Sequence, residues 1–326
     1  MRKKFIFLGL AISLCSAVLK VTDFPEADIT NGIIKAKLYL PDVTNGYYQG
    51  TRFDWGGVIP SLEYKGHTFF GKWFDNYDPK LHDAISGPVE EFTPLEYNET
   101  QPGSEFVKIG VGVLKKTDDK PYSFASNYEV VDNGKWTVKR KNDVVEFTQE
   151  LADKSGYSYI YHKTVRLKKG KPELVLEHSL KNVGRKAIST SVYDHNFFMI
   201  DNEPTGPGIK TTFSFEAAAE GKGFGTIANI KDKSLLFTRN LEKKENVFTA
   251  GVQGLTQSAK DYDLKIENVK TGAGVRITSD QPIEKLVYWA CSTTACPEPY
   301  IKLDVEPGKE IRWTINYEFF AKDNNR

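Results

Sequence analysis

The residues with the clearest chemical potential lie in one apolar stretch, residues 191–200, which reads SVYDHNFFMI. Its β-branched and aromatic residues predict a buried strand, yet Asp194, His195 and Asn196 stand in a row at its centre. Because side chains alternate between the faces of a strand, His195 lies on the face opposite to Asp194 and Asn196. Buried polar side chains need hydrogen-bonding partners, so this row predicts that one face borders a polar cavity. A core histidine with satisfied hydrogen bonds is the other interpretation of His195.

A second segment, residues 47–59, mixes aromatic rings with charged side chains between glycines. Sugars require this combination, because a pyranose presents C–H faces to aromatic rings and hydroxyls to charged donors and acceptors. We therefore predict a carbohydrate site, and the predicted ligand-binding residues are Arg52, Trp55, His82, Glu90, Glu91, Asp194 and Asn196. Two structural interpretations also stay open. In the first, Trp55 is an ordinary core residue; in the second, the paired glutamates form a solvated turn.

Near the C-terminal end, Glu298 stands between Pro297 and Pro299. Each proline ring fixes its own φ angle, and the second proline also restricts the glutamate before it. Such a carboxylate is held in a fixed place, as a catalytic base requires. A surface turn is the alternative interpretation of this three-residue pattern.

The elements that must position these residues are predicted to be β-strands. Turn pairs such as Asn31-Gly32 and Asn133-Gly134 recur at short intervals, and aromatic and β-branched residues fill the runs between them. Many runs are longer than an average strand, which favours two broad antiparallel sheets that face each other. We predict an all-β fold, a large antiparallel β-sandwich, with strands at residues 33–40, 136–141, 144–151, 157–167, 173–180, 187–200, 211–215, 234–238, 262–268, 274–278, 286–290 and 310–320. No repeat or linker marks a boundary, so residues 18–326 are predicted to form a single domain.

The N-terminal residues have the pattern of a secretory signal peptide. Residues 1–4 are basic after the initial methionine, residues 5–15 are apolar or small, and Cys15-Ser16-Ala17 supplies small residues for cleavage. The apolar run is too short to span a membrane. We predict a signal peptide over residues 1–17 and a periplasmic or secreted protein. A lipoprotein anchored through Cys15 is the less favoured alternative, because the preceding Leu14 is bulky.

Composition narrows the partners of the mature chain. Its 44 basic and 43 acidic residues nearly balance and form no blocks, so we expect neither a nucleic-acid partner nor membrane binding after signal removal. Only Cys291 and Cys296 remain after cleavage, and a disulfide between them is plausible in an oxidising compartment. We expect no metal site there, because no histidine or further cysteine lies nearby. A sandwich of this size can be stable alone, so we expect a monomer or weak dimer.

Three motifs together carry a resemblance to a known family. Residues 190–198, TSVYDHNFF, resemble the family's strand with the catalytic histidine in an Asn-His-x-x-Phe-type motif. Residues 279–282, SDQP, resemble its Thr-Asp-Gln-Pro approach to the catalytic glutamate. Residues 297–299, PEP, and residues 307–319 resemble its closing segment. The family is the galactose mutarotase (aldose 1-epimerase) superfamily, and the resemblance covers nearly the whole mature chain.

The resemblance implies a galactose mutarotase-like supersandwich that interconverts the anomers of a free sugar without a cofactor. In the family mechanism, a glutamate takes the proton of the anomeric hydroxyl while a histidine donates one to the ring oxygen; closure on the other face reverses the two roles. Carried onto this sequence, His195 is the acid and Glu298 the base. The family's His-Gly-Gly and Gly-Arg-x-x-Asn-Arg elements are absent. His82 and residues 87–92 fall near the place of the former, and Arg52 is a candidate for the cation of the latter.

Two function classes follow from these observations. The first is an aldose 1-epimerase-like isomerase acting on a monosaccharide or short oligosaccharide, in which His195 and Glu298 approach a common point in a cleft. The second is a non-catalytic carbohydrate-binding protein of the same fold in extracytoplasmic glycan metabolism, which would be indifferent to His195→Asn. A structural or glycan-assembly protein, a third class, predicts an extended groove instead of a closed pocket. The fold alone does not decide among them.

Overall fold

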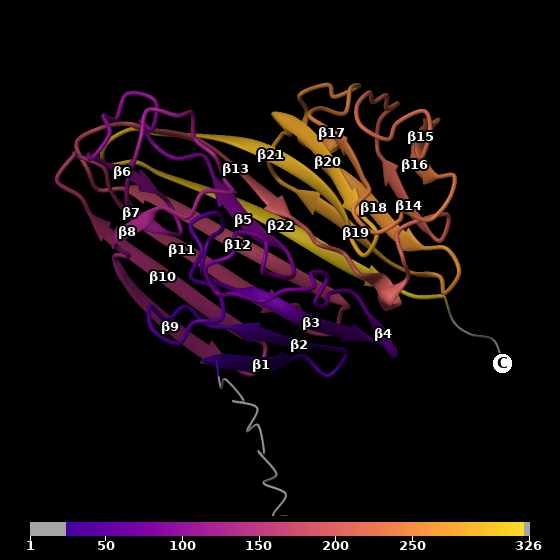
Figure 1. The fold of residues 1–326 in the computed structure, drawn as a ribbon. Coiled ribbons are helices and arrows are strands. Elements are labelled where there is room, and N and C mark those ends of the chain that lie inside the picture. The colour runs from indigo at the N-terminus through magenta and orange to yellow at the C-terminus, as the bar shows by residue number, and fades with distance from the viewer. Residues whose placement is uncertain (1–23, 323–326) are drawn as a thin grey trace, which may run out of the picture.

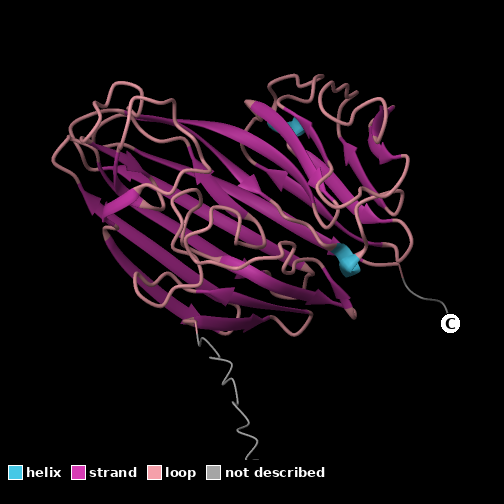
Figure 2. Ribbon diagram, viewed as in Figure 1, coloured by secondary structure: helices cyan, strands magenta, loops and turns pink. Residues whose placement is uncertain are grey.

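A computed structural model describes residues 24–322, so the predicted signal peptide lies outside the described residues. Strands dominate this range (Figure 2), and its helices are the short 3-10 turns η1 (Ile200–Asn202) and η2 (Ala259–Asp261). No helix within residues 24–322 has the length and hydropathy needed to cross a membrane. The prediction of an all-β protein is confirmed.

The strands form four sheets, and all pairings between them are antiparallel. The ten-stranded sheet contains, in spatial order, β15 (Ala228–Lys231), β16 (Ser234–Phe237), β14 (Ile209–Phe213), β18 (Asp263–Asn268), β19 (Ala273–Ser279), β22 (Glu310–Phe320), β12 (Glu173–Asn182), β11 (Ser158–Leu167), β10 (Val144–Ala152) and β9 (Lys135–Lys141). The five-stranded sheet contains β17 (Asn246–Thr249), β20 (Lys285–Cys291), β21 (Ala295–Val305), β13 (Ile188–His195) and β5 (Val89–Phe92).

Two smaller sheets complete the fold. The four-stranded sheet contains β1 (Glu26–Thr30), β2 (Ile34–Tyr39), β3 (Val58–Tyr64) and β4 (His67–Thr68). The three-stranded sheet contains β6 (Glu105–Lys108), β7 (Gly112–Lys115) and β8 (Glu129–Asp132). The five-stranded sheet packs over the ten-stranded one, where β21 contacts β12 and β22, and the four-stranded sheet meets the same large sheet at β10 (Figure 1). The predicted large antiparallel sandwich is therefore confirmed.

The alternation that predicts strands also produces the core between the layers. On β22 every second side chain is buried, and these are Trp313, Ile315, Tyr317 and Phe319. On β11 the inward row is Tyr159, Tyr161, Lys163, Val165 and Leu167. The row on β11 is apolar or aromatic except for Lys163, a charged side chain that is only 1% exposed. A buried lysine requires an anionic partner, and its partners lie directly beneath the site described below.

Two of the strands that differ from the prediction bear on the site, and the first is β13. The predicted run extended to residue 200, but β13 ends at His195. Phe197 has a φ of 43°, a left-handed conformation that cannot continue a strand. His195 therefore stands at the end of a strand, where the ladder opens.

The second is β21, where the sequence predicted no strand and left a surface turn open for Pro297-Glu298-Pro299, but the structure has an eleven-residue strand. The carbonyl of Pro297 accepts a hydrogen bond from Asn196 Nδ2 at 2.7 Å, so it faces the β13 side. The nitrogens of both prolines face the same side, because N and O of one residue point the same way in an antiparallel strand. The β13–β21 ladder has already ended at the Tyr193–Tyr300 pair, so the prolines remove no ladder hydrogen bond.

The disulfide considered from the sequence is not present, because Cys291 and Cys296 are free thiols. The register of β20 and β21 places Cys296 opposite Trp289, so Cys291 is its diagonal neighbour. Diagonal neighbours in a sheet are about 7–8 Å apart at Cα, beyond the usual reach of a disulfide.

Candidate active site

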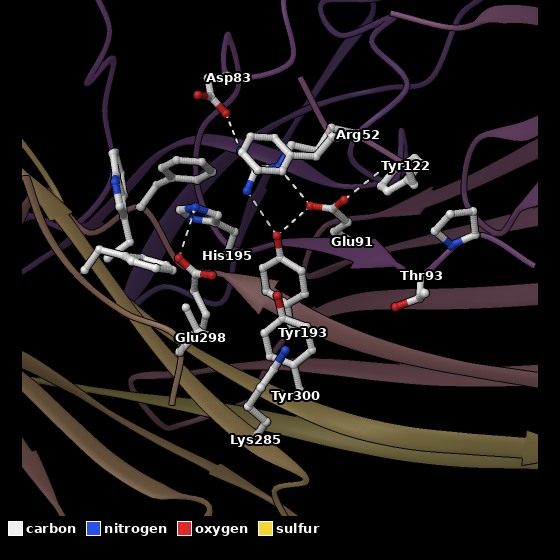
Figure 3. Close-up of a pocket in the computed structure, with 17 residues that line it drawn as sticks. Arg52, Asp83, Glu91, Thr93, Tyr122, Tyr193, His195, Lys285, Glu298 and Tyr300 are labelled. Atoms are coloured by element: carbon white, nitrogen blue, oxygen red, sulfur yellow. Dashed lines mark hydrogen bonds and ion pairs between the residues drawn. The ribbon is translucent and has the colours of Figure 1, made fainter. Parts of the chain in front are cut away.

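A cavity of about 450 Å³ lies over the five-stranded sheet, on the face turned away from the core (Figure 3). The register of the sheet sets the side chains of its floor in rows. Tyr193 of β13 pairs with Tyr300 of β21 and with Glu91 of β5; we call this the tyrosine row. The same register, continued by two residues, brings His195 level with Glu298; we call this the His–Glu row.

His195 and Glu298 are in direct contact, with 3.3 Å between Nε2 and Oε1. The imidazole is enclosed by aromatic rings: Phe197 stacks on it at 3.8 Å between centroids, and Phe53 and Trp289 approach edge-on at 5.7 Å. Nδ1 of His195 is buried and has no hydrogen-bond partner. Phe197 stands two residues after His195 and has the positive φ that ends the strand.

The surroundings of this pair decide where its proton resides. Burial lowers the pKa of His195 well below its usual value, and the nearby Arg52 lowers it further. Burial raises the pKa of Glu298 to about 8, with Arg52 opposing this change and Glu91 adding to it. A neutral His195 that accepts a proton through Nε2 carries its own hydrogen on the buried Nδ1. At neutral pH His195 is therefore a neutral imidazole, and the titrating proton of the pair is on the carboxyl of Glu298.

The raised pKa of Glu298 predicts a pH-dependent cost to stability. The folded carboxyl binds its proton up to about pH 8, whereas the unfolded one releases it near 4.5. Its contribution to stability is thus fully present below the unfolded pKa and is lost as pH rises through this interval. In Glu298→Gln no such loss occurs. We expect the free energy of unfolding of the variant, minus that of the wild type, to increase between about pH 5 and 8, measured by urea titration at each pH. A constant difference across this range would contradict the assignment.

Arg52 is the centre of a second polar cluster at the cavity wall. Its Nε donates to Glu91 Oε2 at 2.8 Å, Nη1 to Asp83 Oδ1 at 2.5 Å and Nη2 to the hydroxyl of Tyr193 at 3.1 Å. Its guanidinium carbon also lies 4.1 Å from the ring centroid of Phe124. All the Arg52 nitrogens thus have partners, and the guanidinium is fixed in place beside the floor.

Glu91 is held ionised by the same cluster. Burial alone would raise its pKa, but Lys108 and Arg52 outweigh burial and lower it. Lys108 Nζ lies 3.1 Å from Glu91 Oε1, and the hydroxyl of Tyr193 donates to Oε2 at 2.5 Å. The cavity wall therefore presents fixed charges that are already balanced within the protein.

Of the predicted site residues, His195, Glu298, Arg52 and Glu91 line the cavity together. Trp55 does not: it is buried in an aromatic cluster, and its Nε1 donates to the carbonyl of Gly50 at 2.8 Å. His82 lies behind the wall, where its Nε2 is 3.1 Å from Asp83, and it is Asp83 that reaches the cavity. The core interpretation of Trp55 is thus the one that matches its position.

Glu90, Asp194 and Asn196 also lie outside the cavity, because they point to the opposite face of the five-stranded sheet. Glu90 forms an ion pair with Lys163 and lies 2.6 Å from Nε2 of His178. Asn196 accepts a hydrogen bond from the hydroxyl of Tyr317 at 2.9 Å. The period of two places neighbouring polar residues on opposite sides of the sheet, so only alternate residues reach the ligand side.

Glu90 and Asp194 belong to a buried ionic network between the sheets. Lys163 is its cation, with Glu90 in contact and Asp54 at 3.7 Å. Burial alone would raise the pKa of Glu90, yet Lys163 and His178 bring it down to about 2. Burial raises the pKa of Asp54 to about 7, and burial also raises that of Asp194 well above its usual value. One lysine and one ionised glutamate therefore dominate the charge of the network.

Several residues of the cavity were not predicted from the sequence. They are Asp83, Tyr122, Phe124, Tyr193, Phe248, Lys285, Trp289 and Tyr300. A signal for two of them was present, because Tyr193 stands two residues before His195 and Tyr300 two after Glu298, on the same faces. No comparable signal exists for Phe124, whose loop is placed by tertiary contacts. Within residues 24–322, no group of three or more His, Cys, Asp or Glu side chains is arranged to hold a metal ion.

Comparison with known proteins gives a match in structure only. No family model and no curated protein matches the sequence. A structure from Escherichia coli, described as a candidate aldose 1-epimerase, is 13% identical, with 91% of this chain and 99% of that chain covered and a TM-score of 0.55. A galactose mutarotase related enzyme from Lactobacillus acidophilus is 12% identical, with coverages of 92% and 98% and a TM-score of 0.54.

A third similar structure, an aldose epimerase homologue from C. elegans, is 13% identical, with 91% of this chain and 98% of that chain covered and a TM-score of 0.54. Similarity at these identities is evidence of a common fold and leaves the reaction to be argued from the site. The chain therefore has the galactose mutarotase-like β-sandwich fold that its sequence motifs predicted.

Proposed function

We propose that this protein is an aldose 1-epimerase-like isomerase that interconverts the anomers of a neutral sugar. The observation that carries the proposal is the contact between His195 and Glu298 inside the cavity. Anomer exchange needs a proton acceptor at the anomeric hydroxyl and a donor at the ring oxygen, and both oxygens are bonded to the same carbon. Two titratable groups in contact and sharing one proton are suited to serve both oxygens. The names of the structural neighbours agree with this reaction.

The favoured location of the proton gives each residue a role. Glu298, which holds the proton, donates it to the ring oxygen while neutral His195 accepts the proton of the anomeric hydroxyl through Nε2. The bond between the anomeric carbon and the ring oxygen breaks and the aldehyde forms. After rotation about the neighbouring C–C bond, His195 returns its proton to the carbonyl oxygen and Glu298 recovers its own from the ring hydroxyl. These roles are the reverse of those that the family resemblance implies, and they follow from the burial of both side chains and, for His195, from the nearby Arg52.

The charges of the cavity support a neutral substrate. The cations that line it, Arg52 and Lys285, equal in number the ionised carboxylates Asp83 and Glu91, because Glu298 is protonated. The guanidinium charge of Arg52 is already paired with Asp83 and Glu91, and three of its five N–H donors bind Asp83, Glu91 and Tyr193. A phosphorylated sugar would find no unpaired guanidinium, so we propose an unphosphorylated aldose.

The test is anomer exchange measured by NMR for a panel of free aldoses, with the wild type and His195→Asn. We expect faster exchange for at least one sugar, and loss of the acceleration in the variant, because asparagine cannot take up the anomeric proton. A carbohydrate-binding protein without turnover would instead bind a sugar and accelerate no exchange. That result would overturn the isomerase and leave the alternative function.

The proposal includes export, because residues 1–17 have the pattern of a signal peptide. We propose that the enzyme acts on sugars outside the cytoplasm. Mass spectrometry of the mature N-terminus would test this, and an intact Met1 in protein recovered from cells would contradict it.

A further inference from the structure

The floor of the cavity is longer than one sugar ring. Beyond the tyrosine row it continues to Thr93, which also lines the cavity and whose backbone N–H donates to the carbonyl of Ser191 at 2.8 Å. Ser191 stands four residues before His195 on β13, so the two levels are about 13 Å apart at the rise of a strand. Figure 3 shows the same arrangement, with Thr93 on the far side of Tyr193 and Tyr300 from the His–Glu row.

A pyranose fills about half of this length. A six-membered ring built from bonds of about 1.5 Å spans roughly 5–6 Å between its first and fourth oxygens. The anomeric carbon must lie at the His–Glu row. Of the polar side chains that line the cavity, Arg52, Glu91 and Tyr193 lie at the tyrosine row, so the ring extends from His195 toward Thr93. The part of the floor beyond the fourth carbon is then open.

The open part has the chemistry of a second sugar site. Tyr300 is partly exposed there and stacks on Tyr193 at 4.2 Å between centroids, which holds its ring rigidly. Lys285 Nζ lies 4.1 Å from the Tyr300 centroid, and Pro94 and Tyr122 also line the cavity. Aromatic and apolar surfaces beside hydroxyl and amine donors bind the faces and hydroxyls of neutral sugars.

We propose that the cavity binds the reducing end of a disaccharide or longer neutral oligosaccharide, with the second sugar between the tyrosine row and Thr93. The inference rests on the proposed function in one respect only, which is the choice of the sugar ring that reacts. The second site itself depends on the shape and lining of the cavity, so it can be tested by binding alone.

The experiment compares each aldose with a disaccharide that has the same sugar at its reducing end: glucose with maltose and cellobiose, mannose with mannobiose, and xylose with xylobiose. The reacting ring is identical within a pair, so any difference reports on the second sugar. We expect kcat/KM for anomer exchange to be about tenfold higher for at least one disaccharide than for its monosaccharide, and its Kd to be lower by a similar factor.

Thr93→Trp tests the position of the second sugar, because an indole at this place would fill the open part of the floor. We expect the ratio of disaccharide to monosaccharide Kd to rise toward or above one in this variant. The matched control is Thr226→Trp, which adds the same indole at an exposed threonine in the turn before β15 and should leave the ratio unchanged.

The outcomes separate the two proposals. Tighter binding of a disaccharide without accelerated exchange would overturn the isomerase and support the second sugar site. Accelerated exchange would support the isomerase. If, in addition, kcat/KM for every disaccharide is equal to or below that for its monosaccharide, the second site is overturned. A disaccharide preference that persists in Thr93→Trp would overturn the placement, and no binding of any sugar would overturn both proposals.

Discussion

Glu298→Gln is expected to lower kcat for anomer exchange by about 10²–10⁴-fold, the usual contribution of a general acid–base group. The glutamine keeps the size and one oxygen of the side chain but has no proton to donate to the ring oxygen. His195 would remain in place, since Phe197, Phe53 and Trp289 enclose its ring. The rate is measured by NMR exchange on the best sugar of the panel, and binding of the same sugar is measured by calorimetry.

The matched control for this variant is Glu306→Gln, the same exchange at an exposed position beyond β21. Its kcat should equal that of the wild type. Full activity in Glu298→Gln would show that the contact with His195 has no part in the chemistry, while a loss of binding in place of a loss of kcat would assign Glu298 to substrate recognition.

Lys163→Met is expected to lower the free energy of unfolding by about 3–5 kcal/mol, the cost of breaking a buried ion pair by removing one partner. Lys163 is 1% exposed and contacts Glu90, and its Nζ also donates to the carbonyl of Gly56 at 2.8 Å. Methionine fills a similar volume but removes the cation from the carboxylate of Glu90, which keeps its 2.6 Å contact with Nε2 of His178. Urea denaturation of the purified variant measures the change.

Lys181→Met is the control for this prediction, because Lys181 is exposed on the neighbouring strand β12 and should tolerate the change within about 0.5 kcal/mol. Adding Glu90→Gln to Lys163→Met removes the uncompensated charge and should restore part of the stability. If the double variant is less stable than Lys163→Met by the full effect of Glu90→Gln, the two side chains do not act as a pair.

The sequence was sufficient for the fold because its strand pattern is simple and repeated. The runs around β11, β12 and β22 alternate over ten or more residues, and antiparallel pairing joins them into wide sheets. The stretch around His195 was identifiable because three consecutive polar residues interrupt an apolar strand, and a strand that only fills the core does not need them. Sequence thus located β13 but predicted no strand for the residues of β21, where the prolines around Glu298 are typical of a turn.

What sequence alone did not provide was the side of the sheet on which each residue lies. Glu90 and Glu91 are adjacent, yet one holds Lys163 in the core and the other holds Arg52 in the cavity. Which of the two glutamates faces the core depends on which face of β5 packs on the large sheet. That packing is set only when the layers assemble. The wall residues Asp83 and Phe124 come from loops whose positions depend on distant contacts, including their own contacts with Arg52.

The division of the cavity between a sheet floor and loop walls has a consequence for how such a protein can change. The reacting pair is fixed by strand register and by the packed layer beneath it, so few substitutions there are tolerated. Asp83, Tyr122 and Phe124 lie outside the strands, where insertions and exchanges cost little. New sugar preferences can therefore arise by replacing wall loops over an unchanged floor, and laboratory selection for altered substrates should concentrate on residues 71–83 and 117–127.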